Sequence, residues 1–176
     1  MVPLFGTARV CGLVMGAAAL FGCADSAPPQ GQPSFYQDLA GPANTLDADA
    51  AQSMISVYRR NNGLDAVTLD LELMRLANEQ ANAMAAAGKL DHEVAQPFQE
   101  RIRKSHFNAG VAVENIGAGY HTLAEAFSGW RDSPPHRANM LNASVTRMGI
   151  AAVFTPKSKY KVFWALILAA PDEHKS

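Results

Sequence analysis

The stretch RMGIAAVFTPKSKYKVFWALILAA, residues 147–170, decides the fold. Its two halves are rich in β-branched and aromatic residues, and PKSK between them, at 156–159, is typical of a tight turn. The pattern predicts an antiparallel β-hairpin. The second half is almost continuously apolar from Val162 to Ala170, whereas a strand with one solvated face alternates between apolar and polar residues. It is therefore expected to be the central strand of a sheet that is covered on both faces.

Upstream of the hairpin, the hydrophobic period changes to that of helices. Apolar residues recur every three or four positions at 47–61 and at 70–87, and a glycine follows each segment closely. PFQERIRK at 97–104 predicts a short third helix, with its proline near the first turn. The β-branched content of 111–116 predicts a strand, and two glycines follow it. Residues 64–69 are expected to be a short connection.

One more helix is expected between this strand and the hairpin. Thr122 and Glu125 fit the S/T-x-x-E capping box, which marks the start of a helix. The helix is expected to stop at Ser133-Pro134-Pro135, and a short helical turn should follow at 136–141. The order of helices and strands argues for an α+β fold, with a small, mainly antiparallel sheet and helices on both of its faces.

The N-terminal segment is typical of an export signal. Arg9 precedes an apolar stretch at 10–21 that is too short to span a membrane comfortably. LFGC at 20–23 resembles a bacterial lipobox, which implies cleavage before Cys23 and a lipid on its sulfur. The protein would then be a lipoprotein, attached to the membrane through Cys23. An ordinary cleaved signal with an incidental cysteine is the alternative.

These features divide the chain into segments. We expect a lipoprotein signal peptide at 1–22 and a flexible tether at 23–45, because the latter is rich in Pro, Gly, Ser and Gln and cannot bury enough apolar surface. The folded domain is expected at 46–171 and a C-terminal tail at 172–176. The predicted location is the cell envelope, where the lipid would anchor an exported domain in the periplasm or at the cell surface.

Charge and cysteine content exclude several classes. The formal net charge is -1 and no basic run occurs, so we expect no nucleic-acid partner. The chain has two cysteines, Cys11 in the signal and Cys23 at its end. The exported domain is therefore expected to have no disulfide and to depend on its core for stability.

Three residues suggest chemistry. His92 and His136 both lie in irregular segments beside the end of a helix, where a rigid scaffold can point a side chain into a cleft. Glu114 interrupts the apolar run VAVENI, and a carboxylate there is either exposed at an edge or held by partners. Two imidazoles and one carboxylate suit a divalent metal, or acid-base chemistry near neutral pH. The long separations make this pattern weak by itself.

Five stretches together resemble the bacterial branch of the CAP superfamily, whose members are also called SCP-like domains and include the CRISP, antigen 5 and PR-1 types. The order and separation of the stretches match, and the resemblance covers roughly 51–170. The stretches are YRRNNGL, LMRLANEQANAMAAAGKLDH, VENIGAGY, AFSGWRDSPPHRANML and MGIAAVF.

The resemblance implies a three-layer α-β-α sandwich with a large cleft, lined by two histidines and acidic residues, where some members bind zinc or another divalent ion. His92 and His136 match the two histidines, and Glu114 matches the glutamate of the E-N-[IL] motif. Ser133 occupies the place where many eukaryotic members have a second glutamate. We therefore expect the metal ligands to be His92, Glu114 and His136, with weaker affinity than a full tetrad. Asn115 and Ser133 are expected in the same cleft.

A second departure from the family pattern is Pro135, which stands where bacterial members usually have glycine. The proline should restrict the approach to His136 and removes one backbone donor.

Three functions remain open, since members of this family do not share one activity. The first is a binding module whose cleft holds a divalent metal, zinc or another, or a small lipid or peptide ligand. The second is a metal-assisted, peptidase-like hydrolase of the cell envelope, with Glu114 as the candidate catalytic base. In the third, the polar cluster is only structural. The sequence contains neither a G-x-S-x-G motif nor an H-E-x-x-H motif, so neither of these catalytic motifs supports the hydrolase.

Overall fold

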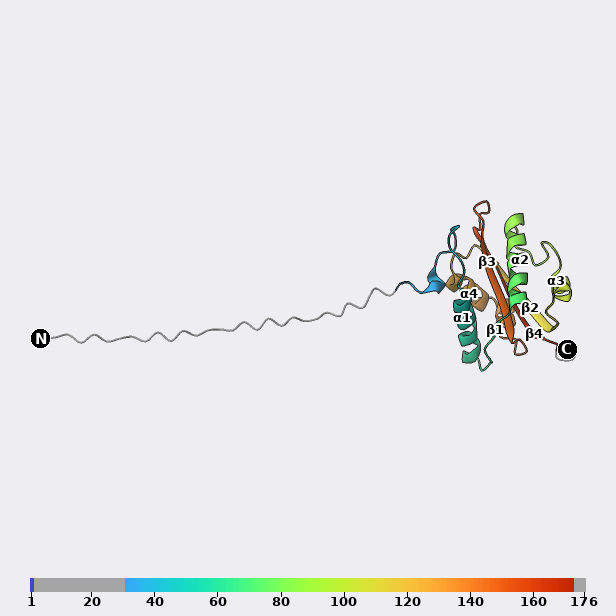
Figure 1. Cartoon of the computed structure of the whole chain (residues 1–176), viewed down its shortest axis with the longest axis horizontal. Coiled ribbons are helices and arrows are strands. Elements are labelled where there is room, and N and C mark those ends of the chain that lie inside the picture. Colours follow the sequence, from blue (N-terminus) through green and yellow to red (C-terminus); the bar gives the residue numbers. More distant parts are fainter. Residues whose placement is uncertain (2–30, 173–176) are drawn as a thin grey trace. The chain divides into compact units, whose positions relative to one another are not determined.

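The computed structural model describes Met1 and residues 31–172 (Figure 1). The expected signal peptide, Cys23 and residues 173–176 of the tail lie outside the described residues. The helices are η1 (Ser34–Tyr36, a 3-10 turn), α1 (Ala48–Asn61), α2 (Leu71–Ala87), α3 (Phe98–Lys104), α4 (Leu123–Asp132) and α5 (Pro134–Met140). The strands are β1 (Thr68–Leu69), β2 (Ala109–Ala118), β3 (Arg147–Phe154) and β4 (Val162–Pro171). In these described ranges no helix is long and apolar enough to cross a membrane.

The four strands form one mixed sheet in the order β1-β3-β4-β2. The hairpin of β3 and β4 is confirmed, with Ile150 opposite Leu166, and β4 is the strand between two antiparallel neighbours. β1, which was not predicted, pairs with β3 in parallel and lies in the expected connection at 64–69. It is only a two-residue strand, so it carries no alternating pattern that the sequence could reveal.

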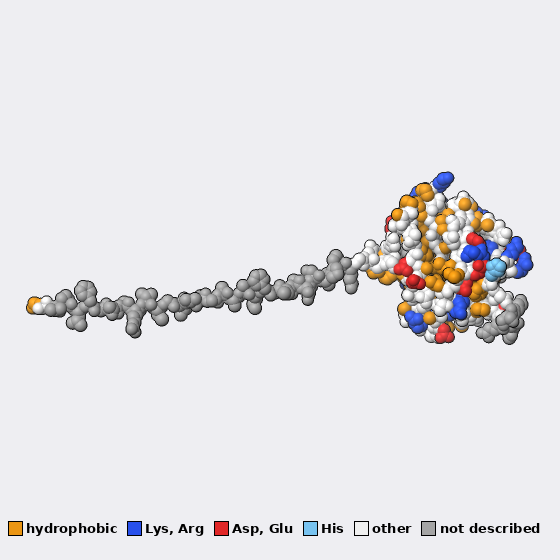
Figure 2. Space-filling model, viewed as in Figure 1, with side chains coloured by type: hydrophobic (Ala, Val, Ile, Leu, Met, Phe, Trp, Pro, Cys, Tyr) orange, Lys and Arg blue, Asp and Glu red, His pale blue; other side chains and the backbone are white. Residues whose placement is uncertain are grey.

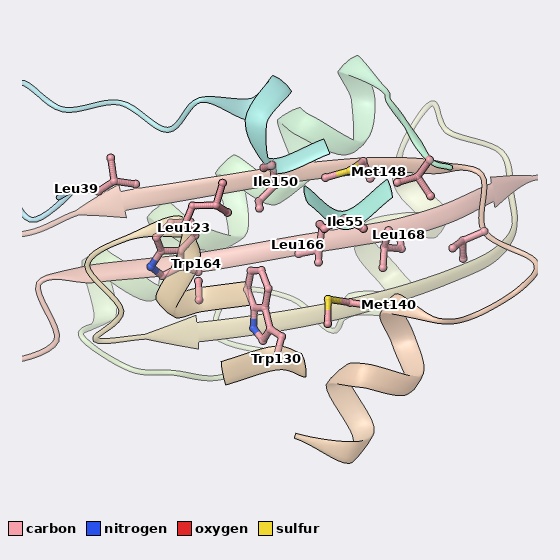
Figure 3. Close-up of a cluster of buried hydrophobic side chains, with 14 of the residues drawn as sticks. Leu39, Ile55, Leu123, Trp130, Met140, Met148, Ile150, Trp164, Leu166 and Leu168 are labelled. Atoms are coloured by element: carbon pink, nitrogen blue, oxygen red, sulfur yellow. The ribbon is translucent and has the colours of Figure 1, made fainter. Parts of the chain in front are cut away.

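Alternation along β4 creates two hydrophobic cores and hence three layers. Val162, Trp164, Leu166 and Leu168 lie in one cluster of buried residues, which also takes in side chains from α1, α4 and α5 (Figure 3). The residues between them lie in a second cluster, with side chains from α2 and α3. The α+β sandwich with helices on both faces is therefore confirmed, and its sheet is mainly antiparallel as expected.

The ends of the helices are fixed by local contacts. The capping box of α4 is confirmed, since Thr122 accepts from Glu125 N and Glu125 accepts from Thr122 N. The predicted stop of α4 is confirmed, since α4 ends at Asp132 with Ser133 as its C-cap. The next helix begins two residues earlier than expected, at Pro134, so both prolines lie in the first turn of α5. Proline is suited to this position, because the first N–H groups of a helix need no intrahelical acceptor.

The expected tether is too long. Leu39 is 4% exposed and lies in the same core cluster as α1 and α4, and its N–H donates to His121 O at 2.7 Å. Phe35 and Ala40 pack against this cluster. The folded domain therefore begins well before residue 46, because a few apolar side chains of this Pro- and Gly-rich stretch pack against the core.

Arg59 on α1 is a buried cation that ties distant segments together. Its side chain is fully buried and donates to four backbone carbonyls. The acceptors are Asp65 O at 2.8 Å, Met140 O at 2.8 Å, Asn142 O at 2.8 Å and Val145 O at 3.1 Å. Burial lowers the pKa of Arg59, and the nearby Asp65 raises it. The end of α1 is thereby joined to the segment that links α5 to β3.

The layer of α2 lies very close to the sheet at Gly149 on β3. A Cβ atom at Gly149 would lie 2.1 Å from the carbonyl carbon of Leu73 and 2.3 Å from the backbone nitrogen of Met74. Only a residue without a side chain permits this approach of helix backbone to strand.

Candidate functional site

The candidate site lies at the free edge of the sheet, along β2. His92 comes from the segment after α2 on one side of the sheet, and His136 comes from α5 on the other. Glu114 is part of β2 itself. A cavity of about 350 Å³ opens beside this edge. Its lining is His92, Glu93, Pro97, Phe98, Gln99, Ala112, Val113, Glu114 and Asn139.

Glu114 is held by a cation that the sequence analysis did not single out. Its side chain is 1% exposed. Nη2 of Arg101 donates to Oε1 at 2.8 Å and to Oε2 at 3.0 Å, and Nδ1 of His92 lies 2.8 Å from Oε2. Both carboxylate oxygens are therefore engaged, and the buried negative charge is compensated by a guanidinium that is 7% exposed.

Arg101 also shapes the segment that carries His92. Nη2 donates to His92 O at 3.2 Å, and Nε donates to Gln96 O at 3.3 Å. The guanidinium carbon lies 5.2 Å from the centre of the Phe98 ring, a cation–π contact. One arginine thus fixes both the carboxylate and the loop that bears the first histidine.

The two histidines are oriented through their Nδ1 atoms. His92, whose side chain is 47% exposed, uses Nδ1 for Glu114. Nδ1 of His136 lies 2.9 Å from Ser133 Oγ. A neutral imidazole that donates through Nδ1 has a free lone pair on Nε2, the atom that binds metals. Burial lowers the pKa of His136, and its electrostatic interaction with the nearby His92 lowers it further, so the neutral ring of His136 is favoured.

Asn115 and Asn139 connect β2 to α5. Asn115 is 1% exposed, and its Nδ2 donates to His136 O at 3.0 Å. Nδ2 of Asn139 donates to Asn115 Oδ1 at 2.8 Å and to Glu114 O at 3.1 Å. Each of the two amides thus satisfies a backbone carbonyl. They set the position of the second histidine relative to the sheet edge.

Comparison with known proteins identifies the family of this chain. The model of the cysteine-rich secretory protein family, CAP, matches residues 52–168. The chain belongs to the CAP family. It is 27% identical over 123 residues to the uncharacterized protein YkwD of Bacillus subtilis (strain 168), a match that covers 62% of this chain and 48% of YkwD. The chain thus spans about half the length of this relative.

Solved structures show the same CAP fold. An outer surface protein from Borrelia burgdorferi matches with a TM-score of 0.64 and 18% identity, over 73% of this chain and 98% of that one. An extracellular protein with an SCP domain from Bacillus anthracis str. Ames matches with a TM-score of 0.60 and 20% identity, over 69% of this chain and 39% of that one.

The expected three-ligand metal set is not assembled in this CAP domain. Among Met1 and residues 31–172, no three His, Cys, Asp or Glu side chains are gathered so as to hold a metal ion. The physical reason lies in Glu114, whose oxygens face Arg101 and His92. The donor chemistry that remains is a pair of imidazoles, which suits zinc or copper better than magnesium or calcium.

Arg101 could have been found from the sequence. It is spaced three residues from Phe98 and precedes Ile102, so it lies on the same face of α3 as these apolar side chains. A cation on the buried face of a helix needs acceptors nearby, and Glu114, which interrupts an apolar run, was an available anion. Arg59 carried a similar signal, one residue after Tyr58 in the apolar pattern of α1.

Proposed function

We propose that the protein is an exported CAP domain whose cleft binds a divalent transition metal through His92 and His136. The observation that carries the proposal is the orientation of the two rings, each held at Nδ1 by a neighbouring side chain. The carboxylate of Glu114 can only accept, so its contact fixes the tautomer of His92 and raises the basicity of Nε2. The Ser133 hydroxyl orients the ring of His136. Export is supported by the N-terminal signal pattern and by the extracellular and outer-surface origin of two structural relatives.

In this proposal Glu114 is a positioning residue and not a ligand. It orients His92 while Arg101 balances its charge. The same contacts argue against the alternative of a peptidase-like hydrolase, because a general base needs a free oxygen that faces the substrate. A metal bound at the histidines would supply a Lewis acid, and the cleft would present it to a ligand.

Isothermal titration of the metal-free protein with zinc tests the proposal. We expect one equivalent to bind and the double variant His92→Ala/His136→Ala to lose at least tenfold in affinity, about 1.4 kcal/mol. His106→Ala removes an exposed histidine outside the cavity and is the matched control. Equal affinity in the parent and the double variant, or no binding by the parent, would reject the proposal.

We propose a separate site for the lipid ligand that the sequence analysis considered. A second cavity of about 670 Å³ lies between η1, α1 and α4, away from the two histidines. Its lining is Pro33, Ser34, Phe35, Ala50, Ser53, Met54, Val57, Tyr58, Asn61 and Phe127. Figure 2 shows a band of hydrophobic side chains over the region of α1. Apolar walls of this kind suit an acyl chain.

A charge placed in this cavity tests the lipid proposal. Val57 is 47% exposed, and Val57→Glu should abolish the binding of a fluorescent fatty acid without unfolding the domain. Leu71→Glu is the matched control, because Leu71 is 90% exposed on α2 and lies outside the cavity. Equal binding by the two variants would contradict the assignment.

A further inference from the structure

The cleft is bounded by the backbone of an edge strand. β2 lies at the end of the sheet order and pairs with β4 on one side. On its other side, Asn139 Nδ2 donates to Glu114 O and Trp130 Nε1 donates to Ile116 O. In an antiparallel ladder, alternate residues direct both peptide groups away from the partner strand. The even-numbered residues of β2 therefore face outward.

Ala112 stands in this outward register, two residues before Glu114. Neither its N–H nor its C=O has an outward partner within residues 31–172, whereas side chains cap the next two outward carbonyls. Ala112, Val113 and Glu114 line the 350 Å³ cavity. An open strand edge is a template for another strand, and proteins usually cover or charge such edges.

The open part of the edge is short and has defined limits. Asn139 closes it at the carbonyl of Glu114. At the other end, the register between β2 and β4 is irregular at Ala109/Val111, as in a β-bulge, which re-aims the backbone. About one outward-facing residue of β2, with its flanking peptide groups, therefore remains open to pairing. This length suits a ligand of two to four extended residues.

We infer that the cleft binds a short extended peptide, which adds to β2 as a further strand and exchanges main-chain hydrogen bonds with Ala112. Pro97 and Phe98 from one layer would contact its side chains, with Asn139 on the opposite wall. A peptide is favoured because the edge offers one donor and one acceptor at strand spacing, a pattern that a peptide bond matches. The inference deepens the proposed function by naming a ligand class for the same cleft, and it requires no metal.

Hydrogen exchange of the full protein, followed by NMR in metal-free buffer, tests the inference. The probe is a pool of capped tetrapeptides built from Ala, Val, Ser and Thr. We expect the pool to slow exchange of the Ala112 amide by at least about tenfold, since protection follows the population of the hydrogen-bonded state. A second pool, N-methylated at the central residues, has lost the donors of a strand and should give no protection.

Ala112→Pro is the matching change in the protein. It removes an outward N–H and leaves the ladder to β4 intact, which is where proline is tolerated in an edge strand. The variant should lose the chemical-shift changes that the pool causes at Val113 and His92. If it fails to fold, the comparison of the two pools decides. Equal protection by both pools, or no protection by either, would overturn the inference.

This experiment is independent of the zinc titration. Peptide protection without zinc binding would remove the metal proposal and leave the strand-addition site. Zinc binding without peptide protection would keep the metal proposal and overturn the strand-addition site.

Discussion

Replacement of Arg59 by methionine should destabilise the domain strongly, although it removes a buried charge. Two of the hydrogen bonds that Arg59 donates, to the carbonyls of Met140 and Val145, are buried. A methionine side chain has no donor for these carbonyls. Each orphaned buried carbonyl costs about 1–3 kcal/mol. Relief of the guanidinium's desolvation offsets part of this, so we expect a net loss of about 2–4 kcal/mol in the free energy of unfolding.

The neighbouring arginine provides a matched control. Arg60 is exposed on the same helix, so Arg60→Met should change stability by less than about 0.5 kcal/mol. Urea unfolding followed by circular dichroism at neutral pH gives both values. A difference of less than about 1 kcal/mol between the two variants would refute the reasoning, because the four carbonyl contacts would then contribute no more than a solvated side chain does.

Three further perturbations test the packing and the charges. Leu39→Ala should cost about 2–5 kcal/mol if residues before 46 belong to the core, while Leu71→Ala, at an exposed site, should be nearly neutral; equal melting temperatures would restore the longer tether. Gly149→Ala should cost more than about 3 kcal/mol because its new methyl group meets the backbone of Leu73, and a well-expressed variant with an unchanged melting temperature would contradict this. Hydrogen bonds from Arg75 lower the pKa of Glu72 to about 2, against 4.5 for the free group. Stability from this ion pair is present above about pH 4.5 and is lost as the pH falls through 2, so Glu72→Gln should flatten that acid loss in unfolding titrations, and a profile identical to the parent would refute the assignment.

Local patterns were sufficient to predict most of the fold. The apolar run of β4 and the capping box at Thr122 each lie within a dozen residues of sequence, and both are present as expected. The contact between His92 and Glu114 is present too. The sequence context of each residue indicated a special role, and the family resemblance implied that both lie in the same cleft.

The missed features depend on partners that are remote in the chain. Arg59 is buried because it meets a carbonyl 81 positions later. Arg101 on α3 compensates the charge of Glu114 on β2, and this contact occupies a carboxylate that the sequence marked as a metal ligand. Leu39 is one apolar residue in a polar stretch, so no period marks it. In each case the stabilisation of the buried side chain comes from tertiary contacts, and a short stretch of sequence around the residue does not contain the partners.

The position of β4 bears on the order in which the domain can form. Among residues 31–172, β4 comes after every other helix and strand, yet β3 and β2 both pair with it and both cores rest on it. A chain still emerging from the ribosome therefore has its helices and outer strands before it has the centre of its sheet. It cannot close around either core until β4 is made, so the apolar faces of the earlier elements stay exposed up to that point of synthesis.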